Sequence, residues 1–395
     1  MREKQVRKKR KISAAKAEKG RVKQAYFDYT LVAIIIFLVC FGLIMLYSTS
    51  SYSARLEHQG NHMYLLERQF KFSLLGIAGM LIVSKIPYHV YAYFAKPIYY
   101  IAFFLMMLVR TPMGIEVNGA RRWLRIPGGT MQPAEVVKIA IVLLIAYLIC
   151  EYEKAIVTRK ALLTIFAWGI AASIGLYLLT ENLSTAIIVF GMTCVMVFVA
   201  YPKSWPFVTA GGAVILGGFL LRKYGERIIH AIAGESDSFR IQRVLMWLDP
   251  GAYDKGFQVV QGLYAVGSGG FFGKGLGKSV QKMIIPEAQN DMIFSIICEE
   301  LGVFGAMVVL LLFGLLLYRL LFVAQNAPDI YGMLLVTGIM AHITIQVVLN
   351  VAVVLNLIPT TGITLPFISA GGTSIVFLLA EMGIALSVSN SIELE

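Results

Sequence analysis

The chain has 395 residues, of which 58% are hydrophobic and 15% are charged, and its mean hydropathy is +0.73. Soluble proteins carry about 25% charged residues, so this composition excludes a soluble domain and indicates a membrane protein. The net charge of +12 is concentrated in residues 1–27, which contain eleven Lys or Arg and two Glu. A basic tail beside a first span is typical of the cytoplasmic side near anionic lipid, so we expect no nucleic-acid partner.

Apolar segments recur along the chain and predict an all-α polytopic membrane protein with about ten transmembrane helices. In chain order they are Asp28–Ser48, Gln69–Ser84, Pro97–Val109, Pro133–Cys150, Ala161–Leu179, Leu183–Tyr201, Phe207–Leu221, Asp291–Leu317, Ile330–Leu355 and Leu365–Ser387. An even number of spans places both chain ends on one side, and the basic tail predicts that this side is the cytoplasm. We therefore expect a cytoplasmic tail at 1–27, a membrane domain at 28–388 and a short cytoplasmic C-terminus at 389–395.

Three longer connections then lie outside the cell, at 49–68, 110–132 and 222–290, the last being a large loop between the seventh and eighth spans. The second and third are rich in cations, among them Arg121, Arg122, Arg240, Arg243 and Lys282. Cations beside outer span ends oppose the usual orientation bias, and an anionic ligand would account for them, because the Arg fork suits phosphate. The alternative is that long translocated loops escape the bias and their cations are solvated.

The large loop contains two distinctive stretches. Ser236–Asp254 mixes apolar and basic residues in a pattern that predicts an amphipathic helix in the membrane interface. Gly251–Gly277 is glycine-rich, but no Lys-Ser or Lys-Thr pair follows at P-loop spacing, so we predict no nucleotide site there.

Two ionisable residues stand near the outer end of the fourth span. Glu135 and Lys138 are three residues apart and therefore share one helix face. Charges inside a membrane tend to pair and to face a protein cavity. The two residues either form a structural ion pair or line a cavity that faces substrate or Asp291.

The stretch Lys282–Gly302 carries five ionisable groups at the start of the eighth span. Asp291 is either the N-cap of that span or a catalytic carboxylate at the outer surface. Glu299 and Glu300 follow about 12–14 Å deeper and point in different directions around a helix, so at least one is expected to serve helix packing. Lys282 and Glu287 are expected at the rim of the site.

The segment Asn356–Ser374 contains two prolines and three glycines that break any continuous helix. Such breaks at membrane depth persist where they are buried in protein or line a cavity, and a new helix start there would direct backbone donors at an anion. The alternative is a simple junction between spans. The four cysteines and five histidines show no metal-ligand spacing, so we predict no metal site formed by protein ligands and no organic cofactor.

Seven motifs, taken together, resemble the SEDS family of shape, elongation, division and sporulation proteins, which includes FtsW, RodA and SpoVE. They are NGARRW (118–123), QPAEVVKIA (132–140), RIQRVLMWLDP (240–250), GFQVVQGLYAVGSGG (256–270), GKGLGKSVQK (273–282), PEAQNDMIFSIICEELG (286–302) and IPTTGITLPFISAGGTS (358–374). The PEA triplet favours the FtsW and SpoVE side of the family. One departure is ENLST at 181–185, where Asn182 replaces the family's aspartate and Glu181 stands beside it.

The resemblance implies a peptidoglycan glycosyltransferase of the bacterial cytoplasmic membrane that polymerises lipid II. Its implied partners are a class B penicillin-binding protein and other membrane proteins of the divisome. By position, Asp291 matches the family's essential aspartate, Trp123 its outer-loop tryptophan, and Glu135 with Lys138 its cavity pair.

On this basis we expect Asp291 to act as general base on an acceptor sugar, with undecaprenyl pyrophosphate as leaving group. The negative charge that develops on this leaving group would be stabilised by cations, with Mg²⁺ or Mn²⁺ bridging phosphate oxygens. The candidate cations are Arg121, Arg122, Arg240, Arg243, Lys138 and Lys282. Two alternatives are a lipid II flippase and a non-catalytic scaffold that activates the penicillin-binding protein.

Overall fold

The computed structural model describes residues 26–57, 61, 63–117, 119–126, 129–233, 239–251 and 256–393; the side chains of 51–57, 154, 226–233 and 239–241 are not described. Residues 1–25 of the predicted basic tail therefore lie outside the described residues.

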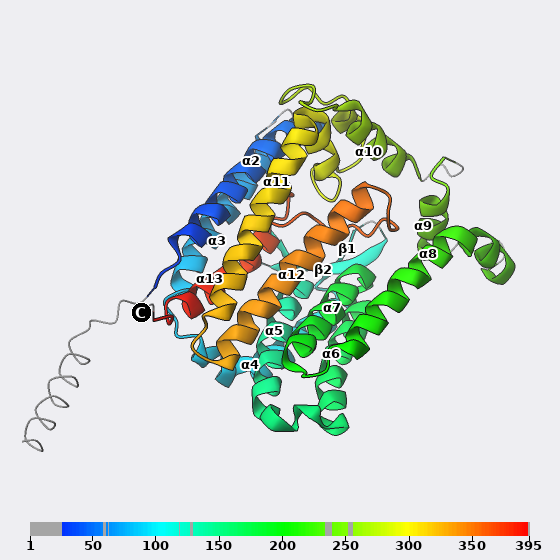
Figure 1. Ribbon diagram of the computed structural model, residues 1–395. Helices are drawn as coiled ribbons and strands as arrows, with labels where there is room; N and C mark the ends of the chain where they lie inside the picture. The colour runs from blue at the N-terminus through cyan, green and yellow to red at the C-terminus, as the bar shows by residue number, and fades with distance from the viewer. Residues whose placement is uncertain are drawn as a thin grey trace, which may run out of the picture.

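Each predicted span corresponds to one long helix of the bundle in Figure 1. The helices are α2 (Tyr29–Glu57), α3 (Tyr64–Val83), α4 (His89–Leu108), α5 (Pro133–Tyr152), α6 (Arg159–Thr180), α7 (Leu183–Ala200), α8 (Trp205–Ala233), α11 (Ile293–Gln325), α12 (Ile330–Val354) and α13 (Thr373–Ser389). Among the described residues, eight of them are long and apolar enough to cross a membrane by length and composition alone. The other two are α3, which has three charged residues in its first turns, and α13, which has 17 residues. The prediction of an α-helical multi-pass membrane protein is confirmed.

Several boundaries differ from the prediction, and α2 and α11 continue beyond their predicted ends to Glu57 and Gln325. Helix α4 begins at His89 rather than at Pro97, so this proline lies inside the helix. Helix α8 continues to Ala233, twelve residues into the predicted outer loop. Helix α13 begins only at Thr373, because Pro366 and the glycine pair before Thr373 keep the preceding residues out of a helix.

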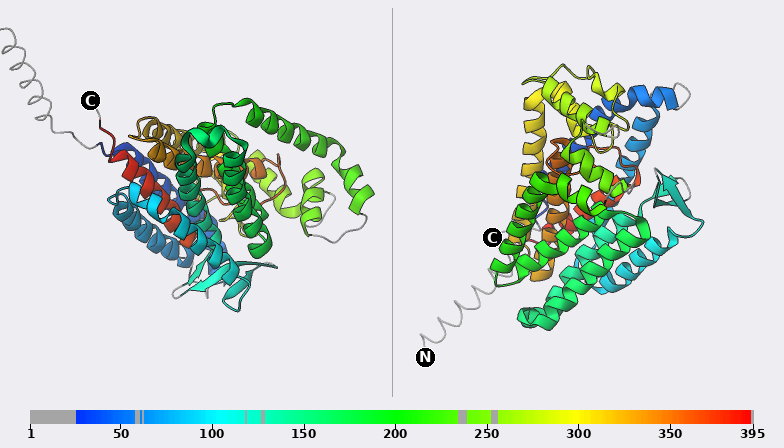
Figure 2. Two further views of the ribbon diagram at one scale, coloured as in Figure 1. Left: turned by 90° about the horizontal axis from the view of Figure 1, so that it is seen from below. Right: turned by 90° about the vertical axis from the view of Figure 1, so that its right-hand side faces the viewer.

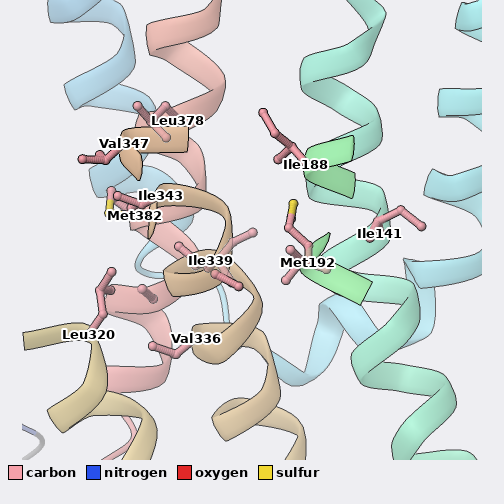
Figure 3. Packing of buried hydrophobic residues seen from close by; sticks show 14 of the residues in the cluster. Ile141, Ile188, Met192, Leu320, Val336, Ile339, Ile343, Val347, Leu378 and Met382 are labelled. Atoms are coloured by element: carbon pink, nitrogen blue, oxygen red, sulfur yellow. The ribbon is translucent and has the colours of Figure 1, made fainter. Parts of the chain in front are cut away.

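The core lies where α12 packs against α5, α7, α11 and α13. Figure 3 shows Ile339 and Ile343 of α12 between Met192 of α7 on one side and Met382 of α13 on the other. Helices α5 and α12 are the most enclosed of the eight candidate spans, since 72% and 67% of the residues in their 18-residue apolar stretches are buried. Polar residues in the buried parts of these two helices therefore lie inside protein and away from lipid.

Helix α8 is the opposite case. No residue of its 18-residue apolar stretch is buried, and its main helix contact is with the short α9 (Phe239–Leu248). Figures 1 and 2 show it along one side of the bundle. Its apolar surface is therefore available to lipid or to another membrane protein.

The connection between α4 and α5 contains a small antiparallel sheet that the all-helical prediction missed. Its strands are β1 (Gly114–Val117), β2 (Ala120–Ile126) and β3 (Gly129–Met131), in the order β1-β2-β3. Trp123 of β2 pairs with Ile115 of β1, which fixes the register of the hairpin.

The large loop after α8 is folded onto the bundle through α9, α10 (Phe257–Ser268) and the short 3₁₀ helix η3 (Gln281–Met283). The predicted amphipathic helix at 236–254 forms as α9, although it is shorter. Trp247 of α9 is 5% exposed and donates its Nε1–H to the Asn356 carbonyl at 3.2 Å. This face of α9 therefore packs on protein.

Candidate functional site

Asp291 lies just before α11 in a loop packed against α12. The helix begins at Ile293 and its N-cap is Met292, so Asp291 does not cap the helix. Asn350 of α12 fixes its backbone by donating Nδ2–H to the Asp291 carbonyl at 2.8 Å. Burial raises the pKa of the Asp291 carboxyl to about 6, and the charge of Glu287 raises it further. The backbone amide of Asp291 and the charge of Arg243 lower this pKa. The carboxyl is therefore suited to exchange a proton near neutral pH.

Two arginines from separate outer elements lie near each other, and the charge of one of them acts on Asp291. Arg243 of α9 is close enough to interact with both Asp291 and Arg122 of β2, and burial together with Arg122 lowers its pKa while Asp291 opposes this. Each guanidinium is held by a backbone carbonyl: Arg243 donates to Thr360 at 3.3 Å, and Arg122 donates to Glu181 at 3.2 Å. Arg243 therefore lies near the carboxyl and Arg122 near Arg243, and such a pair of cations suits an anionic ligand.

Several buried oxygens on the segments that meet at Asp291 have no hydrogen-bond partner within the described part of the chain. They are Gln289 Oε1, two residues upstream, Asn350 Oδ1 on α12, and Thr361 Oγ1, which follows the carbonyl that binds Arg243. Buried oxygens of this kind are uncommon in folded proteins. Two of the three can only accept hydrogen bonds, so a ligand that donates hydrogen bonds would satisfy them.

Glu135 and Lys138 form an ion pair of 2.9 Å near the start of α5, with side chains 12% and 5% exposed. They line a cavity of about 20 Å³ together with Gln346 of α12 and with residues 364–367 and 369 of the broken segment. The two residues therefore form an ion pair beside a cavity large enough for one water molecule, and their exposure to substrate or Asp291 stays a prediction.

Lys282 lies in a different cluster, which ties the glycine-rich loop to α11. Its Nζ is 3.0 Å from Glu300 Oε1 and donates to the Gly277 carbonyl at 2.7 Å. Neighbouring Glu299 pairs with Lys274 at 2.6 Å and accepts the Ser279 hydroxyl. Neither glutamate has a contact with Asp291 within the described part of the chain. Lys282 is thus a buried, paired cation rather than an open rim residue, and its contact with substrate stays a prediction.

The remaining predicted residues are distributed around the outer surface. Arg121 pairs with Glu116 across the exposed hairpin at 3.4 Å. Trp123 is half-buried on β2. Glu287 is exposed and accepts from Asn290 at 2.8 Å. The Arg240 side chain lies outside the described residues.

Asn182 and Glu181, where the sequence departs from the family pattern, both have structural partners. Asn182 caps α7 by accepting the Thr185 amide at 3.0 Å, as an aspartate would. Glu181 forms an ion pair with Arg110 at 3.1 Å, and its carbonyl receives Arg122. The asparagine therefore fills a capping position that an aspartate would also suit.

Sequence reasoning missed a stripe of buried polar residues on α12. His342, Gln346 and Asn350 are four residues apart, so they lie on one face of the helix. His342 also contacts Glu381 of α13 at 2.6 Å. The i, i+4, i+8 spacing was visible in the sequence, but the partners on α13 and on the broken segment were not.

A larger cavity lies elsewhere, on the apolar outer face of α4 and α6. It has a volume of about 770 Å³ and is lined mainly by aromatic and aliphatic side chains, including Tyr99, Phe103 and Trp168. None of the predicted site residues lines it. A face of this kind in a membrane bundle is filled by lipid chains.

Within the described residues, no three His, Cys, Asp or Glu side chains come together as a metal site. The donor set at Asp291 consists of one half-buried carboxyl and the exposed carboxylate of Glu287, which does not make a protein cage for Mg²⁺ or Mn²⁺. A divalent cation held mainly by substrate phosphates stays a prediction.

The matches to known proteins extend along the whole membrane domain. The family model for FtsW, RodA and SpoVE, described as cell cycle protein, matches residues 29–393. Stage V sporulation protein E of Bacillus subtilis is 38% identical over 368 residues, which cover 92% of this chain and 96% of the relative. A probable peptidoglycan glycosyltransferase FtsW of Trichlorobacter lovleyi is 34% identical over 375 residues, covering 94% and 95%.

Two solved structures share the fold. One is a chain from a peptidoglycan synthase complex that coordinates polymerization and crosslinking, with a TM-score of 0.75 and 28% identity over 93% of this chain and 99% of that one. The other is the rod shape determining protein RodA of Thermus thermophilus, with a TM-score of 0.63 and 26% identity over 93% and 98%.

Proposed function

The chain belongs to the FtsW, RodA and SpoVE family of cell cycle proteins, and from this membership we propose that it is a peptidoglycan glycosyltransferase that polymerises lipid II into β-1,4 glycan strands. The observation that carries the proposal is the half-buried Asp291 carboxyl, which feels the charge of Arg243 and has a pKa of about 6. A base with a pKa near the working pH combines the ionised form with useful proton affinity.

In the proposed reaction Asp291 takes the proton of the 4-hydroxyl on the acceptor GlcNAc. The oxygen attacks the anomeric carbon of the donor MurNAc with inversion, and a new C–O bond forms. The bond from that carbon to the pyrophosphate oxygen breaks, and undecaprenyl pyrophosphate leaves with the electron pair. General base catalysis of this kind contributes about 10²–10⁴-fold.

Arg122 and Arg243 are the cations best suited to the leaving pyrophosphate. Backbone carbonyls hold both guanidinium groups, so little reorganisation is needed when charge develops on the leaving oxygen. Mg²⁺ or Mn²⁺ carried by the pyrophosphate would share this charge. Arg121, Arg240, Lys138 and Lys282 are the further candidates.

The unsatisfied oxygens of Gln289, Asn350 and Thr361 support a carbohydrate ligand. Sugar hydroxyl and N-acetyl groups supply the hydrogen-bond donors that these acceptors lack. We infer that they bind the acceptor sugar beside Asp291.

The proposed location is the plasma membrane of a bacterium, with both termini in the cytoplasm and Asp291 at the outer face. The proposed partner is a class B penicillin-binding protein, together with other membrane proteins of the divisome. It is supported by the fold shared with a chain from a complex that coordinates polymerization and crosslinking, because crosslinking requires a transpeptidase.

The test is reconstitution of the full chain with fluorescent lipid II, with and without the cognate penicillin-binding protein. Wild type should form glycan strands, and Asp291→Asn and Asp291→Ala should lose at least about 10²-fold in rate while remaining folded. Glu151→Gln, at an exposed ion pair on the other end of the bundle, is the matched control and should keep wild-type activity.

Two other outcomes would replace the proposal. Normal polymerisation by Asp291→Ala would remove Asp291 from the mechanism. Movement of lipid II between leaflets without polymer would identify a flippase, and activation of the partner's polymerisation by both wild type and Asp291→Ala would identify a scaffold.

A further inference from the structure

Deep in the bundle, four groups from three segments form one chain of hydrogen bonds. Glu381 Oε2 of α13 is 2.6 Å from His342 Nδ1 of α12, and His342 Nε2 is 2.8 Å from Gln346 Oε1. Gln346 then donates its Nε2–H to the Thr364 carbonyl of the broken segment at 2.9 Å. The histidine and the glutamate are 1% and 2% exposed, so the pair is enclosed by protein.

The Thr364 carbonyl fixes the direction of this chain. A carbonyl only accepts, so the amide nitrogen of Gln346 must face Thr364 and its oxygen must face His342. His342 Nε2 must therefore carry a hydrogen and donate it to Gln346. One further proton remains between His342 Nδ1 and Glu381 Oε2, and the pair has zero net charge whichever of the two atoms holds it.

The same face of α12 also reaches Asp291. Asn350, one turn beyond Gln346, donates to the Ile363 carbonyl at 2.7 Å and to the Asp291 carbonyl at 2.8 Å. Successive side chains of one helix thus hold two consecutive carbonyls of the broken segment and the backbone of Asp291. The broken segment in turn binds Arg243 through Thr360.

We propose that His342 and Glu381 are a positioning pair that fixes Gln346, and through it the broken segment whose Thr360 carbonyl binds Arg243, relative to Asp291. This inference rests on the glycosyltransferase function proposed above. The pair acts through Gln346 and does not touch substrate. A rotated Gln346 amide would set two oxygens against each other at Thr364, and loosening this segment would displace a leaving-group cation from the base. Misplacement of about 1 Å between reacting groups costs about 10²-fold in rate.

Substitutions of Glu381 separate orientation from charge. Glu381→Gln keeps a donor for His342 Nδ1, so the Nε2–H bond to Gln346 persists and kcat should be within about twofold of wild type. Glu381→Leu removes the partner, and kcat for glycan synthesis should fall about 10–100-fold with little change in KM. Gln346→Met breaks the links to Thr364 and to His342 but leaves the His342–Glu381 contact in place. It should have the same effect, and it decides the question if Glu381→Leu does not fold.

A second measurement does not depend on activity. Amide hydrogen exchange over residues 363–369 should be faster in Glu381→Leu and Gln346→Met than in wild type, and unchanged in Glu381→Gln. Thr337→Val is the matched control: Thr337 is buried on the same helix, but its hydroxyl binds only the Met333 carbonyl of its own helix, so kcat and exchange should both stay at wild-type values.

Three results would overturn the positioning role. Loss of activity in Glu381→Gln with unchanged exchange would mean that the carboxylate itself is needed, as in a proton relay. Unchanged kcat and exchange in both Glu381→Leu and Gln346→Met would mean that the chain of bonds positions nothing. Activity losses that follow only the fraction of folded protein would indicate a structural role. If wild type makes no glycan, the proposed function fails and the exchange data alone decide the positioning.

Discussion

At the scale of single residues, Asp291 is governed by opposing influences on one proton. Burial and the nearby carboxylate of Glu287 favour the protonated form, and Arg243 favours the ionised form. The pKa of about 6 is the balance of these effects, so each neighbour moves it in a known direction. Activity that needs ionised Asp291 must fall as the pH drops through this value.

The pH profile of kcat/KM should therefore have a rising limb near pH 6 in wild type. Glu287→Gln removes a charge that raises the Asp291 pKa, so its limb should move to lower pH. Arg243→Gln removes a charge that lowers this pKa, so its limb should move to higher pH, in addition to any loss of rate from weaker pyrophosphate binding. Initial rates of lipid II polymerisation over pH 4.5–8 measure both shifts, with Glu151→Gln as the unshifted control. Limbs that coincide in all variants would assign the titration to another group.

Lys282 was predicted to contact the substrate, and in the structure it forms an ion pair with Glu300. One double variant separates a role in substrate binding from a role in holding the loop. Glu300→Leu alone leaves a buried ammonium without its partner and should destabilise the fold by about 3–5 kcal/mol. Lys282→Met with Glu300→Gln removes the charge from both sides and keeps acceptors for Ser48 and Ser279, so thermal stability should return close to wild type.

The activity of the double variant then decides the role of Lys282. Wild-type polymerisation by this stable double variant would show that Lys282 only anchors the loop. A stable but inactive double variant would show that its charge also reaches the pyrophosphate.

At the scale of elements, α11 is interrupted where the glycine-rich loop meets it. Gly302 adopts φ 70° and ψ −168° inside the helix, which lets the amides of Val303 and Phe304 bond to the carbonyls of Gly270 and Phe271. The glycine-rich segment, considered above as a phosphate loop, is therefore used for close backbone contact with α11. The carboxylates of Glu299 and Glu300 complete the same junction.

Two glycine substitutions in α11 should behave in opposite ways. A Cβ at Gly302 would lie 2.3 Å from the Phe271 carbonyl oxygen, and the positive φ adds strain, so Gly302→Ala should lower the thermal unfolding midpoint and the activity. Gly314→Ala meets no atom within 4 Å and lies in regular helix, so it should be neutral or stabilise by up to about 1 kcal/mol. Thermal unfolding of both purified variants makes the comparison, and equal midpoints would contradict the role assigned to the break.

At the scale of the whole molecule, the sequence predicted what depends on apolar runs and local breaks. All ten helices of the bundle, the junction near Asp291 and the shared face of Glu135 and Lys138 follow from patterns within about 20 residues. The sheet was missed because its strands are short and β2 is basic, although Gly119 lies at the turn between β1 and β2.

Contacts between distant segments had no local signal. Arg243 and Asp291 are 48 positions apart, and Arg122 comes from a third element. Glu381 of α13 contacts His342 of α12, although the broken segment separates the two helices in the sequence. Their proximity follows from how the helices pack, which periodicity within one helix does not specify. The site therefore emerged from the fold, while its central aspartate was already visible in the sequence.

The orientation of the bundle is the last prediction, because the proposed chemistry requires the Asp291 side to face outward. In a variant whose four cysteines are replaced by alanine, single cysteines at Met283 and Val157 test the two ends of the bundle. Both side chains are 51% exposed, and they lie on the loop before Asp291 and on the connection between α5 and α6 respectively. A membrane-impermeant maleimide applied to intact cells should label Met283→Cys at once and Val157→Cys only after permeabilisation. The reverse pattern would place Asp291 in the cytoplasm, where a polymerase of external glycan has no substrate to extend.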